Sequence, residues 1–358
     1  MSNWIEVFRP AADPSAEEIR LGDWIGLSRY GDLEGEYHTA RNRIGLHDRS
    51  YRGLLEVTGA DRASWLHNLT TNQIGTLQPG EGNYTFATNL KGRILFDMNV
   101  SVRPEAIWLD LDIRWLHLAQ RHFDKYTIVE DVVVRDRSDE FLRLALIGAQ
   151  APALLARLGA SNAAVMPFLQ ISRLTVDGAE IACFRHDLCG LFAADLLVPK
   201  DFAKAVWNTL RACDGVTPVG YQAVDMLRME AGIPWPVSEI NDQVLPAETG
   251  QLHRAVSFTK GCYLGQEIVE RMRSRESLAR KLSLLRFDGQ RVPQPGDQLF
   301  ADHTHVGQVS SACRSLKFGA PIALAYLRAA HAAPGTSVKL ESEAGDIQGT
   351  VVPLQPED

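Results

Sequence analysis

The sequence predicts an α+β protein, in which two mixed units are followed by a small C-terminal β-barrel. Three observations support this prediction. The chain of 358 residues is long enough for two or three domains. Helix-like and strand-like patterns alternate up to about residue 280, and six short β-rich segments follow at close spacing. Hydrophobic residues make up 45% of the chain and charged residues 23%, which is typical of a globular protein.

The first predicted unit covers residues 1–136. Asp61 is a suitable N-cap for the segment RASWLHNL, whose Trp65 and Leu69 lie four residues apart and share one helical face. The segments GRILFDMNVSV and AIWLDLDI then read as two strands joined by a turn. An amphipathic stretch from Trp115 to Phe123 predicts a further helix. This unit is therefore expected to combine a hairpin with helices.

The second predicted unit covers residues 137–280. It begins with the buried strand FLRLALIG and the helix APALLARLGA, which ends at Gly159. In ISRLTVDGAEIACF, Asp177-Gly178 separates two β-rich runs and predicts a tight hairpin. Two helices are expected at 201–213 and 221–231. The pattern is compatible with an exchange of segments between the first two units.

The third predicted unit, residues 281–358, is the barrel. Its strands are KLSLLRF, QLFA, HVGQVSSA, IALAYL, SVKLE and GTVVPL, separated by Gly, Pro and Asp. His303 and His305 are spaced to approach a metal from one strand face, but no third ligand is evident nearby. A turn in the barrel is the better interpretation, and no metal site is predicted.

The charge and cysteine content restrict the function. With 37 Lys and Arg against 44 Asp and Glu, the net charge is 37 − 44 = −7, which disfavours general binding to nucleic acid or anionic lipid. The first twenty residues mix acidic and apolar side chains, and no run of about 18 apolar residues occurs, so a cytoplasmic protein without membrane association is expected. The five cysteines form no CxxC pair, and the common nucleotide, zincin and serine-hydrolase motifs are absent.

The stretch FTKGCYLGQE at 258–267 has the strongest chemical signal. Cys262 precedes a predicted helix and follows Lys260 by two residues, and both features favour a thiolate. Gly261 and Gly265 flank it and would permit close approach of a ligand. The alternative is a packed, inert thiol. In the helix that follows, Glu267 and Arg271 predict an ordinary i,i+4 pair on a solvated face.

A second group of candidates lies in LRMEAGIPWPVSEINDQVLPAE. Arg228 offers a bidentate fork for a carboxylate, Trp235 offers a stacking surface, and Glu230, Glu239 and Glu248 offer acceptors for ring N–H groups. Together they suit a planar ligand with an anionic tail. The alternative is that the charged residues form surface ion pairs and that Trp235 fills a domain seam.

Asp97 is the candidate on a strand. In NLKGRILFDMNV it shares one face with Leu95 and Asn99, and a carboxylate among apolar residues often has a functional role. The alternative is that Asp97 lies in solvent at a strand end.

KGCYLGQEIVER resembles the K-G-C-Y-x-G-Q-E signature of the YgfZ family of folate-binding proteins, which are relatives of the glycine-cleavage T-protein. ARNRIGLHDRSYRGLLEVTGADRASWLHNLTTNQI, VDMLRMEAGIP and HVGQVSSACRS with IALAYL resemble further blocks of that superfamily. The resemblance implies a cloverleaf of two α+β (ferredoxin-like) units and a β-barrel around a central hole that binds tetrahydrofolate or a one-carbon derivative.

Departures from the aminomethyltransferase branch are visible at three places. Its two adjacent aspartates, one of them catalytic, fall on Phe96 and Asp97. The glutamate of its Y-T-G-E-x-G-F-E segment falls on Leu191, and its Leu-Tyr-Gly falls on WPV at 235–237. The cysteine signature instead belongs to the YgfZ branch, although RSRESLARKL lacks the Arg-Gly that often follows there.

The resemblance implies a tetrahydrofolate-binding accessory protein that supports synthesis or repair of Fe–S clusters in client enzymes, together with those clients or assembly proteins as partners. Cys262 would be the functional thiol, shaped by Lys260 and Tyr263, while Asp97, Arg228 and Glu230 would line the folate hole. The alternative is a T-protein-like aminomethyltransferase or demethylase that uses Asp97, and a third is a folate-binding scaffold without thiol chemistry. A monomer is compatible with each, and a cluster held by this chain itself is disfavoured because its thiols are scattered.

Overall fold

The computed structural model describes residues 4–186, 188–275, 278–341 and 345–354, and the chain forms two compact units. The first unit consists of residues 1–85 and 98–224, and the second of residues 86–97 and 225–358. Three elements pass from one unit to the other: β5 (Gly82–Thr88), β6 (Ile94–Val102) and α7 (Tyr221–Glu230). The boundaries proposed above after residues 136 and 280 remain predictions.

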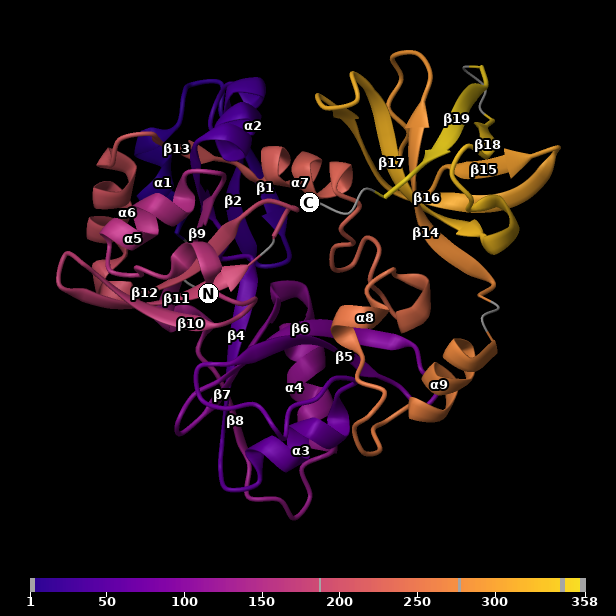
Figure 1. Cartoon of the computed structure of the whole chain (residues 1–358). Helices are drawn as coiled ribbons and strands as arrows, with labels where there is room; N and C mark the ends of the chain where they lie inside the picture. Colours follow the sequence, from indigo (N-terminus) through magenta and orange to yellow (C-terminus); the bar gives the residue numbers. More distant parts are fainter. Residues whose placement is uncertain (1–3, 187, 276–277, 342–344, 355–358) are drawn as a thin grey trace. The chain divides into compact units, whose positions relative to one another are not determined.

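A six-stranded sheet forms the larger part of the first unit (Figure 1). Its order is β10 (Ile171–Val176), β11 (Ala179–His186), β12 (Ala193–Pro199), β9 (Phe141–Ile147), β3 (Ile44–Asp48) and β13 (Val216–Val219). Neighbouring strands are antiparallel, except that β13 runs parallel to β3. The sheet therefore joins strands from both predicted α+β units.

The second sheet has the order β5, β6, β7 (Ile107–Asp112), β4 (Arg52–Thr58) and β8 (Val133–Asp136). A separate hairpin pairs β1 (Glu17–Leu21) with β2 (Trp24–Arg29). The helices of this unit are α1 (Ile5–Phe8), α2 (Leu33–Asn42), α3 (Arg62–Leu69), α4 (Leu116–Lys125), α5 (Ala151–Arg157) and α6 (Ala203–Ala212).

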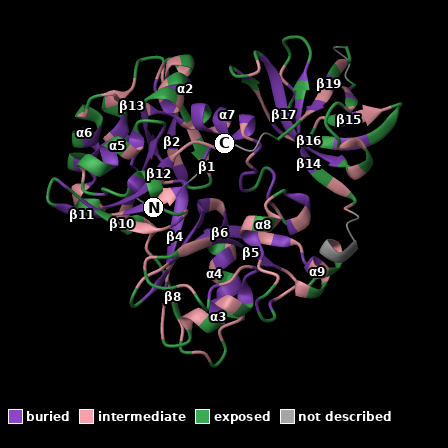
Figure 2. Cartoon of the chain, in the orientation of Figure 1, coloured by how far each residue is buried: buried purple, intermediate pink, exposed green. Residues whose placement is uncertain are grey.

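Period-two alternation along the strands decides which side chains enter the main core. Leu142, Leu144 and Leu146 on β9 pack with apolar residues of α1, α5 and α6, and all three are fully buried. Arg143 points to the opposite face, where a smaller apolar cluster contains Leu54 of β4. Central strands of both sheets, such as β12 and β6, are largely buried (Figure 2). The two sheets of the first unit therefore pack face to face.

Most local predictions are confirmed, and one mechanism is wrong. The hairpin turn at 177–178 has positive φ at both residues, 49° and 78°, as the Asp-Gly pair predicts. Helix α3 begins where predicted, but the Asp61 side chain makes no bond to its N–H groups. Instead that carboxylate accepts a hydrogen bond from the backbone N–H of Asp131, 70 residues away. A tertiary contact has replaced the predicted local cap.

The second unit contains a closed six-stranded barrel, so the predicted fold class is confirmed. Its strands in barrel order are β14 (Arg280–Phe287), β17 (Ala320–Arg328), β16 (Thr304–Ser315), β15 (Gln298–Ala301), β18 (Ser337–Leu340) and β19 (Ile347–Val352). Asp302 and His303 form the tight turn between β15 and β16, with φ of 46° and 61°. The turn predicted at His303 is thus confirmed.

Before the barrel, the second unit has α7, α8 (Leu252–Ala255) and α9 (Gln266–Arg275). Each described helix is ten residues long or shorter, and none among the described residues has the length and hydropathy needed to cross a lipid bilayer.

Candidate functional site

The segment KGCYLGQE leads into α9 through a turn, since the N–H of Gln266 donates to the carbonyl of Tyr263 at 3.2 Å. Cys262 is exposed, whereas Tyr263 and Lys260 are 7% and 9% exposed. The thiol stands four residues before the first residue of the helix. The chain thus presents one thiol to solvent between two buried polar side chains.

Gly265 holds this segment against the turn between β5 and β6. Its φ is 85°, and a Cβ there would lie 2.4 Å from the carbonyl oxygen of Asn89. The Thr88 hydroxyl also donates to the carbonyl of Leu264. On Gly92, a Cβ would lie 2.9 Å from the side chain of Ile268. Gly265 is therefore required for close backbone packing, and approach of a ligand to it stays a prediction.

Burial alters the acid–base chemistry of both flanking residues. It lowers the pKa of Lys260 to about 7, so that a neutral amine is accessible near neutral pH. Burial, with the nearby Glu270 carboxylate, raises the pKa of Tyr263 well above its ordinary value. The ammonium nitrogen of Lys260 lies 5.2 Å from the centroid of the Tyr263 ring. Among the described residues the Tyr263 hydroxyl has no hydrogen-bond partner, although it is buried.

The Arg228 and Glu239 side chains form a buried ion pair. The guanidinium Nη1 donates to the carboxylate Oε2 at 2.6 Å, and Nε donates to Asp225 at 2.7 Å. The side chains of Arg228 and Glu239 are 2% and 0% exposed. The guanidinium carbon also lies 5.2 Å from the ring centroid of Trp235. These contacts give Arg228 a structural role inside the unit, and its contact with folate remains a prediction.

Two glutamates of this segment, Glu239 and Glu230, join it to the barrel. Glu239 accepts hydrogen bonds from the N–H of Trp235 at 2.9 Å and from the Ser311 hydroxyl at 2.6 Å. Glu230 accepts bonds from the Ser315 hydroxyl at 2.5 Å and from the N–H of Lys317 at 3.1 Å. The acceptors predicted to meet a pterin ring therefore meet protein donors. The alternative of exposed surface ion pairs does not apply to these residues.

Asp97 lies within β6 and is 4% exposed, so the alternative of a solvated strand end is wrong. Phe96 beside it is fully buried. Because successive side chains of a strand point to opposite faces, Phe96 and Asp97 serve different sides of the sheet. A second aspartate at position 96 would not share the environment of Asp97. Glu267 and Arg271 form the predicted exposed pair, with nitrogen and oxygen 2.7 Å apart.

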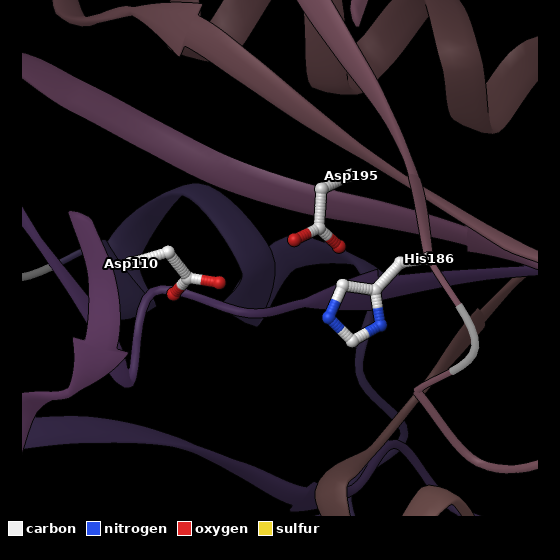
Figure 3. Close-up of side chains that lie close together, drawn as sticks. All are labelled: Asp110, His186 and Asp195. Carbon is white, nitrogen blue, oxygen red and sulfur yellow. The ribbon is translucent and has the colours of Figure 1, made fainter. Parts of the chain in front are cut away.

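A buried ionic cluster between the two sheets of the first unit was not predicted. Figure 3 shows its three potential metal ligands, Asp110, His186 and Asp195, whose ligand atoms lie within 4.8 Å of one another. Arg52 and Arg143 donate to Asp110 at 2.7 and 2.5 Å, and a third arginine, Arg49, donates to Asp195. Its members are these six residues together with Asn99.

The charges of this cluster favour a structural network over a cation site. Burial alone would raise the pKa of Asp110, but Arg143, Arg52 and Arg49 hold it well below its usual range. Nε2 of His186 lies 3.1 Å from Asn99 Nδ2 and 3.1 Å from an Arg49 nitrogen, so it is an acceptor and the ring is neutral. Three guanidinium groups therefore face two carboxylates, and this excess of positive charge disfavours a divalent ion.

The structure thus brings Arg228, Trp235 and Glu239 into one network and Lys260 and Tyr263 into another. The ionic cluster has a signal in the sequence, because Arg143, Asp110 and Asp195 interrupt otherwise apolar strands. Which interrupted strands face each other depends on the packing of the sheets, and local patterns do not contain that information.

Comparison with known proteins identifies the domains. Residues 16–260 match the GCVT N-terminal domain, and residues 280–356 match the glycine cleavage T-protein C-terminal barrel domain. The chain therefore belongs to the glycine cleavage T-protein (GCVT) family. The aminomethyltransferase of Streptomyces coelicolor is 33% identical over 343 residues, which cover 93% of this chain and 90% of that protein. The aminomethyltransferase of Geobacillus kaustophilus is 28% identical over 360 residues, 97% and 96% of the two chains.

A solved structure shows the same fold. The glycine cleavage system aminomethyltransferase T from Bartonella henselae matches with a TM-score of 0.88 at 22% identity, over 98% of this chain and 96% of that one. The superfamily predicted from the sequence is confirmed, whereas membership of the YgfZ branch remains a prediction.

Proposed function

We propose that this protein is a tetrahydrofolate-dependent one-carbon transferase of the aminomethyltransferase type. The observation that supports it best is the 33% identity to an aminomethyltransferase over 93% of the chain. Aminomethyltransferases of this family use tetrahydrofolate as the one-carbon acceptor, so the predicted cofactor is confirmed for the family. In the sequence analysis the aminomethyltransferase was the alternative to the Fe–S accessory role. The comparisons support the aminomethyltransferase better. We further propose that the protein acts in the cytoplasm.

The second unit offers polar groups that fit such a ligand. The Tyr263 hydroxyl is a buried donor that lacks a partner among the described residues, and a buried group of this kind is stabilised when a ligand accepts a hydrogen bond from it. Lys260 supplies a buried amine whose charge changes near neutral pH. We propose that Tyr263 and Lys260 help to hold the folate, and that Trp235 and Arg228 act by shaping the wall behind it.

Bound tetrahydrofolate supplies the ring nitrogen that accepts the one-carbon unit. In this proposal Asp97 is the catalytic carboxylate, which holds or moves a proton during transfer. Phe96 stands where the aminomethyltransferase branch has a second aspartate, so Asp97 is the single carboxylate at these two positions. Asp97→Asn should therefore lower the transfer rate by at least about 100-fold while tetrahydrofolate still binds.

A calorimetric titration with tetrahydrofolate tests the shared step. The wild-type protein should bind with a Kd at or below about 100 μM, on the order of −5.5 kcal/mol. Tyr263→Phe removes only the hydroxyl and should weaken binding about tenfold. Arg228→Ala, the obvious variant from sequence, is a poor probe because it leaves the buried Glu239 without its cation. Undetectable binding to the wild-type protein would exclude both folate-dependent hypotheses.

A second candidate function is the Fe–S accessory role, with client enzymes or assembly proteins as partners. The exposed Cys262 thiol within the K-G-C-Y-x-G-Q-E signature favours it. Cys262→Ser separates the two hypotheses, and Cys213→Ser is a matched control on a thiol outside the signature. Aminomethyl transfer that survives Cys262→Ser supports the transferase. Loss of client Fe–S activity in Cys262→Ser cells alone, without detectable transferase activity, would support the accessory role instead.

A further inference from the structure

The second unit has an open pocket whose lining combines barrel strands with residues 237–244, and neither Tyr263 nor Lys260 is among its described lining residues. The pocket has a volume of about 690 Å³, and its lining includes residues of β14, β16 and β17. A second depression of about 570 Å³ shares Gln243, Arg280 and Arg328 with it. Volumes of this size are typical of sites for small organic ligands.

Three arginines give the pocket an excess of positive charge. Arg93 and Arg280 both donate to the carbonyl oxygen of Gln243, so two guanidinium groups lie side by side. Arg280 is paired at 3.0 Å with Glu248, the single carboxylate among the described lining residues. Neither Arg93 nor Arg328 has an ion-pair partner among the described residues. Two of the three positive charges therefore have no counter-charge within the described part of the chain.

Arg280 is also held in one orientation, which makes the pocket a preformed site. Its guanidinium carbon lies 4.9 Å from the ring centroid of Tyr326, a cation–π contact. The Tyr326 hydroxyl donates to the Glu239 carbonyl at 2.9 Å and so fixes the ring. A guanidinium whose direction is already set loses little freedom when an anion binds.

The remaining wall is apolar and includes a strained residue. Val244, Val309 and Tyr326 are buried side chains of the lining, and Val237 exposes 41% of its surface at the edge. Val237 has a φ of 70°, a conformation that a β-branched residue rarely adopts. Its backbone is held there by a hydrogen bond from its N–H to the carbonyl of Ile240. Strain of this kind is concentrated at ligand sites.

We infer that this pocket binds an organic anion that carries two or more carboxylate or phosphate groups on an apolar body. The planar forks of Arg93, Arg280 and Arg328 suit either group, and the valines and Tyr326 suit the body. These arginines are not among the residues proposed to hold tetrahydrofolate, so failure of either binding measurement leaves the other proposal standing.

The test is a calorimetric titration of the full chain with benzene-1,3,5-tricarboxylate as the organic anion. A Kd at or below about 1 mM is expected, and Arg328→Gln should weaken binding about tenfold. Arg314→Gln is the matched control, because Arg314 is an exposed arginine on β16 outside the pocket, and it should change the Kd less than twofold. Equal weakening by both variants, or a wild-type Kd above about 10 mM, would overturn the inference.

Two further arms separate the chemistry of the ligand. Inorganic phosphate should bind at least tenfold more weakly than the tricarboxylate, and equal binding would reduce the pocket to a site for simple counter-ions. A phosphorylated aromatic compound, phenyl phosphate, distinguishes carboxylate from phosphate recognition through its Kd relative to benzoate. Unchanged melting temperatures of the two arginine variants exclude a folding defect as the cause.

Discussion

Glu239→Gln should destabilise the second unit by about 3–5 kcal/mol, which is typical when one member of a buried ion pair is removed. The substitution keeps the shape of the side chain but removes its charge. Glu239 is fully buried and accepts three hydrogen bonds, from Arg228, Trp235 and Ser311. Gln offers one acceptor oxygen and turns an N–H₂ donor toward groups that are themselves donors. Arg228 would keep its ion pair with the partly exposed Asp225.

The assay is differential scanning calorimetry of the transition that contains the barrel. The unit has 12 + 134 = 146 residues, a size at which 1 kcal/mol shifts Tm by roughly 2–4 °C, so a decrease of about 6–20 °C is expected. Glu248→Gln is the control, because its partner Arg280 is 34% exposed, and it should cost only about 1–2 kcal/mol. An equal decrease in the free energy of unfolding in the two variants would refute the argument that burial of the ion pair makes its disruption costly. The double variant Arg228→Met/Glu239→Leu should recover most of the loss.

Three further predictions concern single residues of the second unit. Val237→Gly should raise the free energy of unfolding by about 1 kcal/mol relative to Val237→Ala in urea titrations, because alanine keeps the Cβ at positive φ, and equal values would argue against strain. Lys260→Met should be more stable than wild type by a few kcal/mol at pH 7. Since the folded pKa of Lys260 is lowered to about 7, the unfolded chain binds more protons between pH 7 and 10.5, and wild-type stability rises there. The advantage of Lys260→Met should therefore shrink between pH 7 and 10, and a constant advantage would contradict the lowered pKa. Gly265→Ala should lower Tm more than Gly289→Ala. Both glycines have a left-handed φ, 85° and 77°, but only a Cβ at residue 265 would meet the Asn89 carbonyl, whereas the space around Gly289 is open.

Local sequence signals predicted the elements well where one segment determines its own conformation. Asp177-Gly178 specifies a hairpin without help from the rest of the chain, and each of the six predicted barrel segments forms a strand. Asp61 shows the limit, because a side chain suited to capping was taken by a backbone N–H 70 residues further on. Competition between a local and a distant partner is decided by packing, which a single sequence does not display.

The sequence identified the residues of the candidate site, but it did not predict which residues they contact. Arg228 and Glu239 were assigned to a ligand because charged residues in an irregular segment commonly bind one. The structure shows that they neutralise each other in the interior, where an unpaired charge would be costly, and their contact with a ligand stays a prediction. A valine does not predict a left-handed backbone. The positive φ of Val237 follows from the path of the chain between Trp235 and Ile240. The aminomethyltransferase branch has a glycine where this chain has Val237. The φ of 70° at Val237 explains why that difference matters, because glycine adopts this conformation without strain.

The parallel pairing of β3 with β13 has a consequence for biosynthesis. The His47 ring bonds to the carbonyl of Val219 at 2.9 Å, and the two residues are 172 positions apart. At about 5–20 residues per second, a ribosome takes roughly 9–34 seconds to cover that distance. During this time one edge of β3 has no partner strand, and such an edge invites pairing with other chains. A chaperone that binds the nascent N-terminal half would therefore raise the yield of folded protein. The barrel strands pair within the last 80 residues and face no such delay.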